Sequence, residues 1–111
     1  MIGLIRDKKE IDEIITQNIK GKKLIFTQNF GIRNAMRDIS YEMVLKVFPQ
    51  FDKVFAIEKK LLKLGDTGYE LFYNLSNNIT FSIATITKGN DVLLIHAIEY
   101  KRSLGKRFKI G

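Results

Sequence analysis

The hydrophobic pattern of the chain changes at its only proline, Pro49. Before this residue, apolar side chains recur every three or four positions, as on one face of a helix. After it, apolar and polar residues alternate, as in strands with one buried face. The turns between the later segments are too short for the crossover that parallel strands need. The sequence therefore predicts an α+β fold, with two or three N-terminal helices packed on one face of a four-stranded antiparallel β-meander.

The first predicted helix covers about residues 8–19. Residues 7–10 form a capping box, because Asp7 can accept from the first-turn amides and Glu10 can reach back. Gly21 follows at the position of a C-cap. The apolar side of this helix consists of Ile11, Ile14, Ile15 and Ile19.

Two further helices are predicted before the proline. Residues 24–26 form a short apolar run, either an edge strand or a packed connector. A second helix begins near Asn29, and Ser40 is the predicted N-cap of a third helix. Pro49 ends that helix, since the residue before a proline is disfavoured in the α region.

The alternating pattern predicts four strands, at residues 53–58, 69–75, 79–86 and 92–101. In the third, the bulky side chains Ile79, Phe81 and Ile83 face the helices. The opposite side chains, Thr80, Ser82 and Ala84, form a shallow open face, continued by Glu70, Phe72 and Asn74. In the last strand Val92, Leu94 and Ile98 oppose Leu93, Ile95 and Ala97, so this strand is covered on both faces or central to the sheet.

Length and composition limit the classes of function. With 111 residues the chain forms a single domain, residues 1–111. It has no cysteine and one histidine, so neither disulfides nor a conventional zinc site is expected. No cofactor or metal-binding motif is present, and no cofactor is expected. The apolar run at residues 1–5 is too short for a signal peptide, so none is expected, and no apolar run approaches the roughly 20 residues that span a membrane. We therefore expect a cytoplasmic protein without a membrane partner.

Positive charge is concentrated at the C-terminus. The chain has a formal net charge of +7, of which a basic tail at about residues 101–111 supplies five positive charges without an acid. Such a cationic segment attracts phosphate backbones. A solvated tail that aids solubility is the alternative. The candidate nucleic-acid-binding residues are Lys101, Arg102, Lys106, Arg107 and Lys109.

Four other residues are candidates for chemistry. His96 is the only side chain that ordinarily titrates near neutral pH, and it is either a general acid or base or a satisfied, partly buried histidine. Arg33 and Arg37 lie one helical turn apart and could clamp a phosphate, or form a solvated helix face. Tyr100 precedes the basic tail, where an aromatic ring could stack on a nucleotide.

The order of helices and sheet over residues 27–102 resembles the RelE-like superfamily of small ribonuclease toxins. The likeness is to an uncharacterised branch whose helix carries a histidine and two arginines. Two stretches carry the likeness. The branch's helix and the turn after it are resembled by Arg33, the run Arg37-Asp38-Ile39-Ser40 and Val44. The branch's last strand is resembled by residues 96–101. Phe30 stands where the branch usually has its histidine.

The resemblance implies a toxin-like, metal-free endoribonuclease of the mRNA interferase type. Arg33 and Arg37 would stabilise developing negative charge, and His96 or Tyr100 would move protons. The expected partners are RNA rather than DNA, and a neutralising antitoxin-like protein. Two alternatives remain open, namely a non-catalytic nucleic-acid-binding module and a small interaction or homodimeric accessory protein that pairs through an exposed edge strand.

Overall fold

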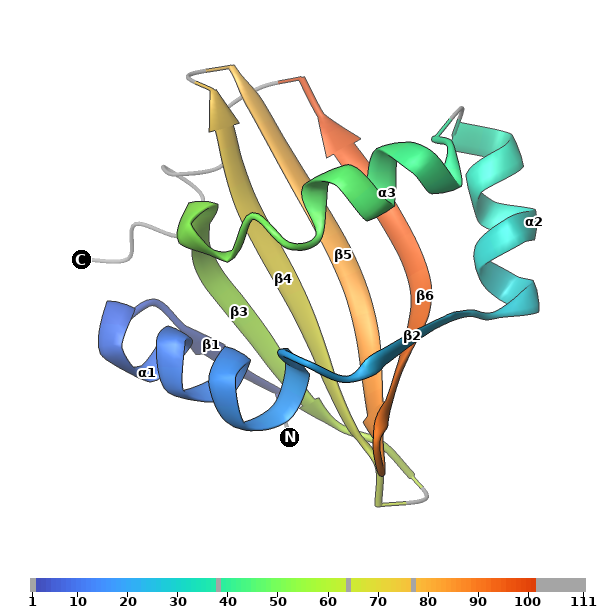
Figure 1. The fold of residues 1–111 in the computed structure, drawn as a ribbon. Helices are drawn as coiled ribbons and strands as arrows, with labels where there is room; N and C mark the ends of the chain where they lie inside the picture. Colours follow the sequence, from blue (N-terminus) through green and yellow to red (C-terminus); the bar gives the residue numbers. More distant parts are fainter. Residues whose placement is uncertain (1, 38, 64, 77, 102–111) are drawn as a thin grey trace.

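The computed structural model describes residues 2–37, 39–63, 65–76 and 78–101 (Figure 1). Its helical elements are α1 (Lys8–Ile14), the π-helix η1 (Ile15–Ile19), α2 (Gln28–Arg37), α3 (Tyr41–Val47) and the 3₁₀ turn η2 (Phe51–Lys53). Its strands are β1 (Ile2–Ile5), β2 (Lys23–Phe26), β3 (Val54–Leu61), β4 (Thr67–Ser76), β5 (Ile79–Lys88) and β6 (Asp91–Tyr100).

The described strands form one sheet in the order β1-β3-β4-β5-β6-β2. The predicted α+β class and the central antiparallel meander, β3 to β6, are confirmed. The predicted number of four strands is wrong, because the N-terminal region adds one strand to each edge. β1 pairs antiparallel with β3, and β2 pairs parallel with β6. Both added strands have only four residues, a length at which alternation cannot distinguish a strand from a connector.

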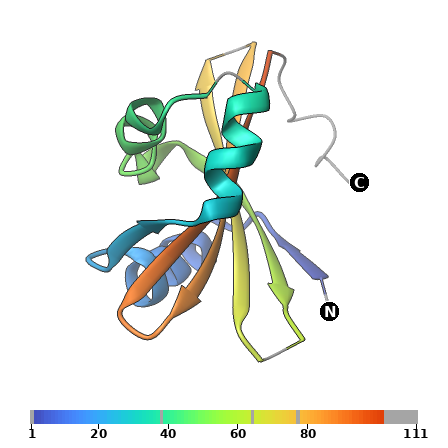
Figure 2. The same cartoon turned by 90° about the vertical axis from the view of Figure 1, so that its right-hand side faces the viewer.

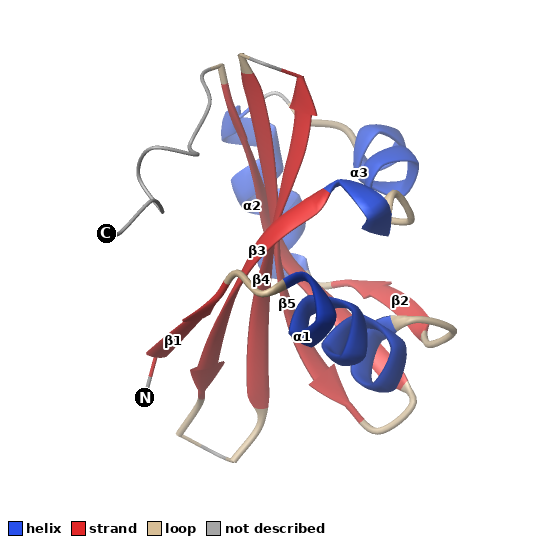
Figure 3. Cartoon of the chain, turned by 90° about the vertical axis from the view of Figure 1, so that its left-hand side faces the viewer, coloured by secondary structure: helices blue, strands red, loops and turns tan. Residues whose placement is uncertain are grey.

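The helices cover one face and one edge of the sheet. α1 and α3 lie over the same face, as the two side views show (Figures 2 and 3). α2 instead lies beside β6, with its C-terminal end toward the C-terminal end of that strand (Figures 1 and 2). β2 occupies the edge of β6 only from Asp91 to Leu94. α2 therefore continues along the edge where β2 stops.

The first predicted helix is confirmed, with an unpredicted change of helix type. The Asp7 carboxylate accepts from the amide of Glu10 at 3.0 Å, as a capping box requires. Ile11, Ile15 and Ile19 are buried at intervals of four residues. A stripe with this spacing drifts around a 3.6-residue helix, and the wider π-helical turn over η1 counteracts the drift. The three isoleucines therefore keep facing the sheet.

An aromatic cluster joins β2, α2 and α3. The Phe30 ring is fully buried and lies 4.9 Å from Phe26 and 5.5 Å from Tyr41, between ring centroids. The predicted cap of α3 is confirmed, because the Ser40 hydroxyl accepts from the amide of Met43. Phe30 thus has a core-packing role at the position where the RelE-like branch usually has a histidine.

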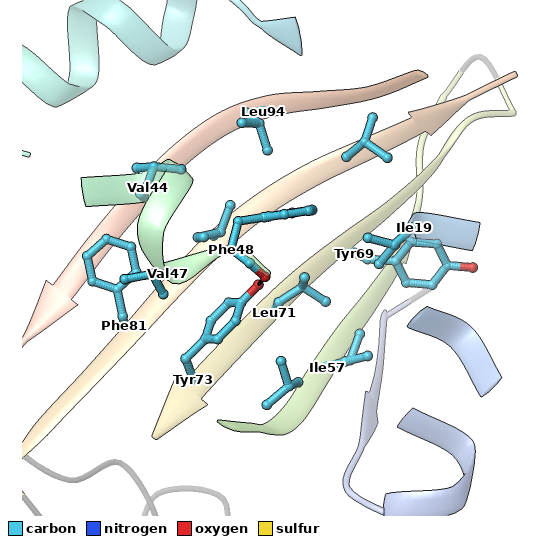
Figure 4. Packing of buried hydrophobic residues seen from close by; sticks show 14 of the residues in the cluster. Ile19, Val44, Val47, Phe48, Ile57, Tyr69, Leu71, Tyr73, Phe81 and Leu94 are labelled. Atoms are coloured by element: carbon cyan, nitrogen blue, oxygen red, sulfur yellow. Dashed lines mark hydrogen bonds between the residues drawn. The ribbon is translucent and has the colours of Figure 1, made fainter. Parts of the chain in front are cut away.

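The main core lies between the sheet and the helices (Figure 4). Four fully buried side chains point into it from neighbouring positions on the meander, namely Ile57, Leu71, Phe81 and Ile83. The Tyr73 hydroxyl donates to the carbonyl of Phe48 at 2.8 Å, and the same view shows this bond. One buried hydrogen bond therefore ties β4 to the end of α3.

A β-bulge changes the predicted faces of β6. The pairing with β5 shifts between Ala84, opposite His96, and Thr85, opposite Leu94, so Ile95 is an extra residue. Ile95 and His96 both line the pocket described below, on the face away from α1 and α3. Beyond the bulge Ala97, not Ile98, joins Val92 and Leu94 in the main core. The predicted assignment of the β6 side chains to the two faces of the sheet was wrong, because strict alternation does not hold across a bulge.

The face away from α1 and α3 is less open than predicted. The expected register is confirmed, with Phe72 opposite Ser82. However, Phe72, Thr80 and Ser82 are all buried. Phe72 packs with Ala56, Leu4, Phe55 and Tyr100 in a second, smaller apolar cluster. The small side chains lie between larger ones, since Ser82 is flanked by Phe72 and Ile98.

Candidate functional site

Three ionisable side chains lie in one cross-strand row on the face away from α1 and α3. Glu58 of β3 is directly opposite Glu70 of β4. Ala84 of β5 is opposite Glu70 on one side and His96 of β6 on the other. Glu58, Glu70 and His96 are all half-buried. Strand pairing therefore brings together two carboxylates and the only histidine of the chain.

A pocket of about 210 Å³ opens over this row. It is lined by Glu58, Lys60, Leu62, Gly68, Tyr69, Glu70, Ala84, Thr85, Ile86, Ile95 and His96. Lys60 lies two residues after Glu58 on the same strand, so it shares the face of the two carboxylates. The pocket thus combines two carboxylates, a lysine and a histidine with the apolar side chains of Ile86 and Ile95.

In this row only the small side chain of Ala84 lies between Glu70 and His96. Their strands are two positions apart in the sheet, which places their backbones about 9.5 Å apart. A carboxylate and an imidazole that extend toward each other above an alanine can flank one small group, such as a phosphate. Glu58 is closer to Glu70, with Cβ atoms about 5 Å apart. Like charges at this separation repel each other, and the exposed Lys60 amine in the same pocket offsets this repulsion.

This arrangement suits proton transfer. A carboxylate can accept a proton and an imidazolium can donate one. Among the described residues no group of three histidine, cysteine, aspartate or glutamate side chains is arranged to hold a metal ion. Tyr69 also borders the pocket, but its side chain packs in the main core on the opposite face, where burial raises the pKa of its hydroxyl above the ordinary value. Tyr69 therefore stays protonated at neutral pH.

The other predicted catalytic residues lie outside this pocket. Tyr100 is on the same face of β6 as His96, but four residues further along, a distance of about 13 Å. It packs against the second apolar cluster. Arg33 and Arg37 belong to α2, at the edge of β6, and their side chains are not among those described. The structure therefore joins His96 with Glu70 and not with Tyr100.

Of the predicted nucleic-acid-binding residues, Lys101 follows β6 and is exposed. Arg102, Lys106, Arg107 and Lys109 lie outside the described residues. The alternating pattern of β4 predicts the face of Glu70 but indicates no role for it, and nothing in the sequence singles out Glu58 or Lys60. The signal that identifies them is their cross-strand register with His96, which depends on the pairing of four strands.

Comparisons with known proteins returned no match among protein family models, curated proteins or solved structures. The resemblance to the RelE-like superfamily therefore rests on the order of helices and sheet and on the short sequence motif. No helix in the described parts of the chain is long and apolar enough to cross a membrane.

Proposed function

We propose that the protein acts on RNA as a metal-free, toxin-like endoribonuclease and that its catalytic pair is Glu70 and His96. The observation that supports this proposal is the cross-strand row in which these two side chains flank Ala84. A scissile phosphate above Ala84 would have a base on one side and an acid on the other. The basic composition, with a net charge of +7, favours a polyanionic substrate.

In the proposed reaction the Glu70 carboxylate removes the proton of a ribose 2′-hydroxyl. The 2′-oxygen attacks the adjacent phosphorus, and the bond from phosphorus to the 5′-oxygen of the next nucleotide breaks. His96, as imidazolium, gives its proton to that leaving oxygen. The products are a 2′,3′-cyclic phosphate and a free 5′-hydroxyl. No oxidant, metal or cofactor takes part.

Negative charge develops on the phosphoryl oxygens during this reaction. Lys60 is the cation that lines the pocket, and we assign to it the stabilisation of this charge. Arg33 and Arg37 remain proposed contributors, since α2 contacts the strand that carries His96. Tyr100 and the basic residues from Lys101 onward are proposed to hold the RNA beyond the pocket.

The decisive experiment incubates labelled mixed-sequence RNA with purified protein in EDTA. Variants Glu70→Gln and His96→Asn are compared with Glu13→Gln, which removes one acidic charge from an exposed position of α1. We expect chelator-resistant cleavage that falls about 10²–10⁴-fold in the two pocket variants and is unchanged in the control. Cleavage should also show a bell-shaped dependence on pH, because Glu70 must be ionised and His96 protonated. Intact RNA at high protein excess contradicts the proposal.

The same experiment addresses the non-catalytic alternative. RNA that stays intact but binds in a salt-dependent manner would favour a nucleic-acid-binding module. A protein partner, such as a neutralising antitoxin-like protein or a second copy, is a separate proposal. It is favoured by exposed apolar side chains on the two neighbouring helices α2 and α3, namely Ile32, Tyr41 and Leu45. Pairing through the sheet edges is less favoured, since both described edge strands have only four residues.

A further inference from the structure

A notch lies at the edge of β3 because β1 covers only part of that strand. β1 pairs with the stretch from Ile57 to Lys60 and ends at Ile5. The first residues of β3, Val54 and Phe55, therefore extend beyond the end of β1. Together with residues that follow β1, residues that precede β3 and one residue of β4, they line an open cavity of about 480 Å³.

Cations from three different segments surround this notch. Arg6 follows β1, Lys8 is the first residue of α1, and Lys53 precedes β3. Asp52 is the single carboxylate among the lining residues, so positive charge exceeds negative charge by two. Arg6 and Lys53 adjoin the end of β1 and the start of β3, the two strand ends that define the notch, so we take them as its principal anion-binding groups. Lys8 also forms an exposed ion pair with Asp12 at 3.3 Å.

Two uncharged residues complete the notch. Asn74 contributes an amide that can donate to a phosphate oxygen, and Phe55 contributes an aromatic ring. The pairing of β3 with β4 shifts between Val54 and Ala56, so Phe55 is an extra residue in a bulge. It packs with the second apolar cluster, on the face that also holds the Glu70 and His96 pocket. A charged rim beside an aromatic ring is the combination that binds single-stranded nucleic acids.

We propose that this notch binds a backbone phosphate of single-stranded nucleic acid, with Arg6 and Lys53 as its main ligands. The assignment deepens the proposed function, since it places a second contact for the substrate outside the catalytic pocket. Asn74 and Glu70 are four residues apart on the same face of β4, a distance of about 13 Å. A short stretch of extended RNA can therefore occupy both sites.

The test measures binding without cleavage. A fluorescent 2′-O-methyl RNA octamer lacks the attacking hydroxyl, and its affinity is measured across a range of salt concentrations. The double variant Arg6→Gln/Lys53→Gln is compared with Lys46→Gln/Lys59→Gln, which removes the same charge from exposed positions outside the notch. We expect the notch variant to weaken binding about tenfold at low salt and to lower the slope of log affinity against log salt by about 0.7, the value for one phosphate contact. The control pair should change affinity less than threefold.

Three results would overturn this assignment: equal weakening in both double variants, no binding of the octamer, or equally tight binding of polyglutamate. The outcome is separable from that of the catalytic proposal. A wild-type protein that binds the octamer through the notch but leaves ordinary RNA intact would support the notch and contradict catalysis by Glu70 and His96. Circular dichroism of each variant confirms that the fold is retained.

Discussion

Tyr73 connects the sheet to the helical layer through a single side chain. Its hydroxyl donates to the carbonyl of Phe48, and the residue is fully buried. We predict that Tyr73→Phe lowers the free energy of unfolding by about 1–3 kcal/mol, because the Phe48 carbonyl loses its buried donor. Urea unfolding followed by circular dichroism measures this change. Tyr41→Phe is the control. Because the Tyr41 side chain is half exposed, this substitution should change the free energy of unfolding little.

The same residue makes stability depend on alkaline pH. Burial raises the pKa of the Tyr73 hydroxyl well above that of an unfolded tyrosine. Its contribution to stability is therefore fully present below the unfolded pKa of about 10 and is lost as the pH rises above that value. The wild-type protein should lose more stability between pH 9 and pH 11 than Tyr73→Phe does. Parallel losses in the two proteins would contradict this account.

At the scale of elements, the bulge in β6 acts as a one-residue insertion in an otherwise regular strand. Leu94 faces the main core, Ile95 and His96 face the pocket, and Ala97 faces the core again. Removal of Ile95 would restore strict alternation and leave every other side chain on its present face. The bulge therefore affects the orientation of the His96 side chain more than it affects which residues form the core.

We predict that deletion of Ile95 leaves a cooperatively folded protein but sharply reduces cleavage, because His96 is re-aimed and the pocket loses one wall. Deletion of Leu93 is the matched control. It would make Val92 and Leu94 neighbours, so that one of these two fully buried side chains must leave the core. Urea unfolding and the RNA assay are applied to both. Equal destabilisation by the two deletions would show that the bulge is required for folding itself.

The sequence predicted the elements better than their pairing. Local signals were sufficient for the caps at Asp7 and Ser40 and for the four central strands. They were insufficient for β1, whose role depends on its pairing with β3 more than 50 residues later in the chain. The bulge at Ile95 also left no local signal, since the residues around it are apolar on both faces of the strand.

The candidate site was predicted only in part for the same reason. His96 could be singled out by residue type, because it is the only histidine. Glu58, Glu70 and Lys60 are ordinary strand residues until the registers of β3, β4, β5 and β6 are combined. A site made by cross-strand neighbours has no fixed spacing along the sequence.

At the scale of the whole molecule, the charge distribution predicts how nucleic acid binding responds to salt. Five cations follow β6 and contribute to the net charge of +7, and four of them are Lys101, Arg102, Lys106 and Arg107. Their joint replacement by glutamine should reduce the salt dependence of RNA affinity by up to about 2.8 in log–log slope, at ~0.7 per phosphate contact. Fluorescence anisotropy at several salt concentrations measures this slope. An unchanged slope would show that these residues do not contact the backbone.

The sheet order has a consequence for how the chain folds. β1 and β2 are synthesised before β3 to β6, but they pair with the two outer edges of the meander that these later strands form. Thr27, directly after β2, bonds to Leu94, 67 residues further along the chain. Such distant pairing slows folding, while the meander itself forms between neighbouring strands. The edges of the meander in a newly synthesised chain can therefore pair with other chains until β1 and β2 have paired with β3 and β6.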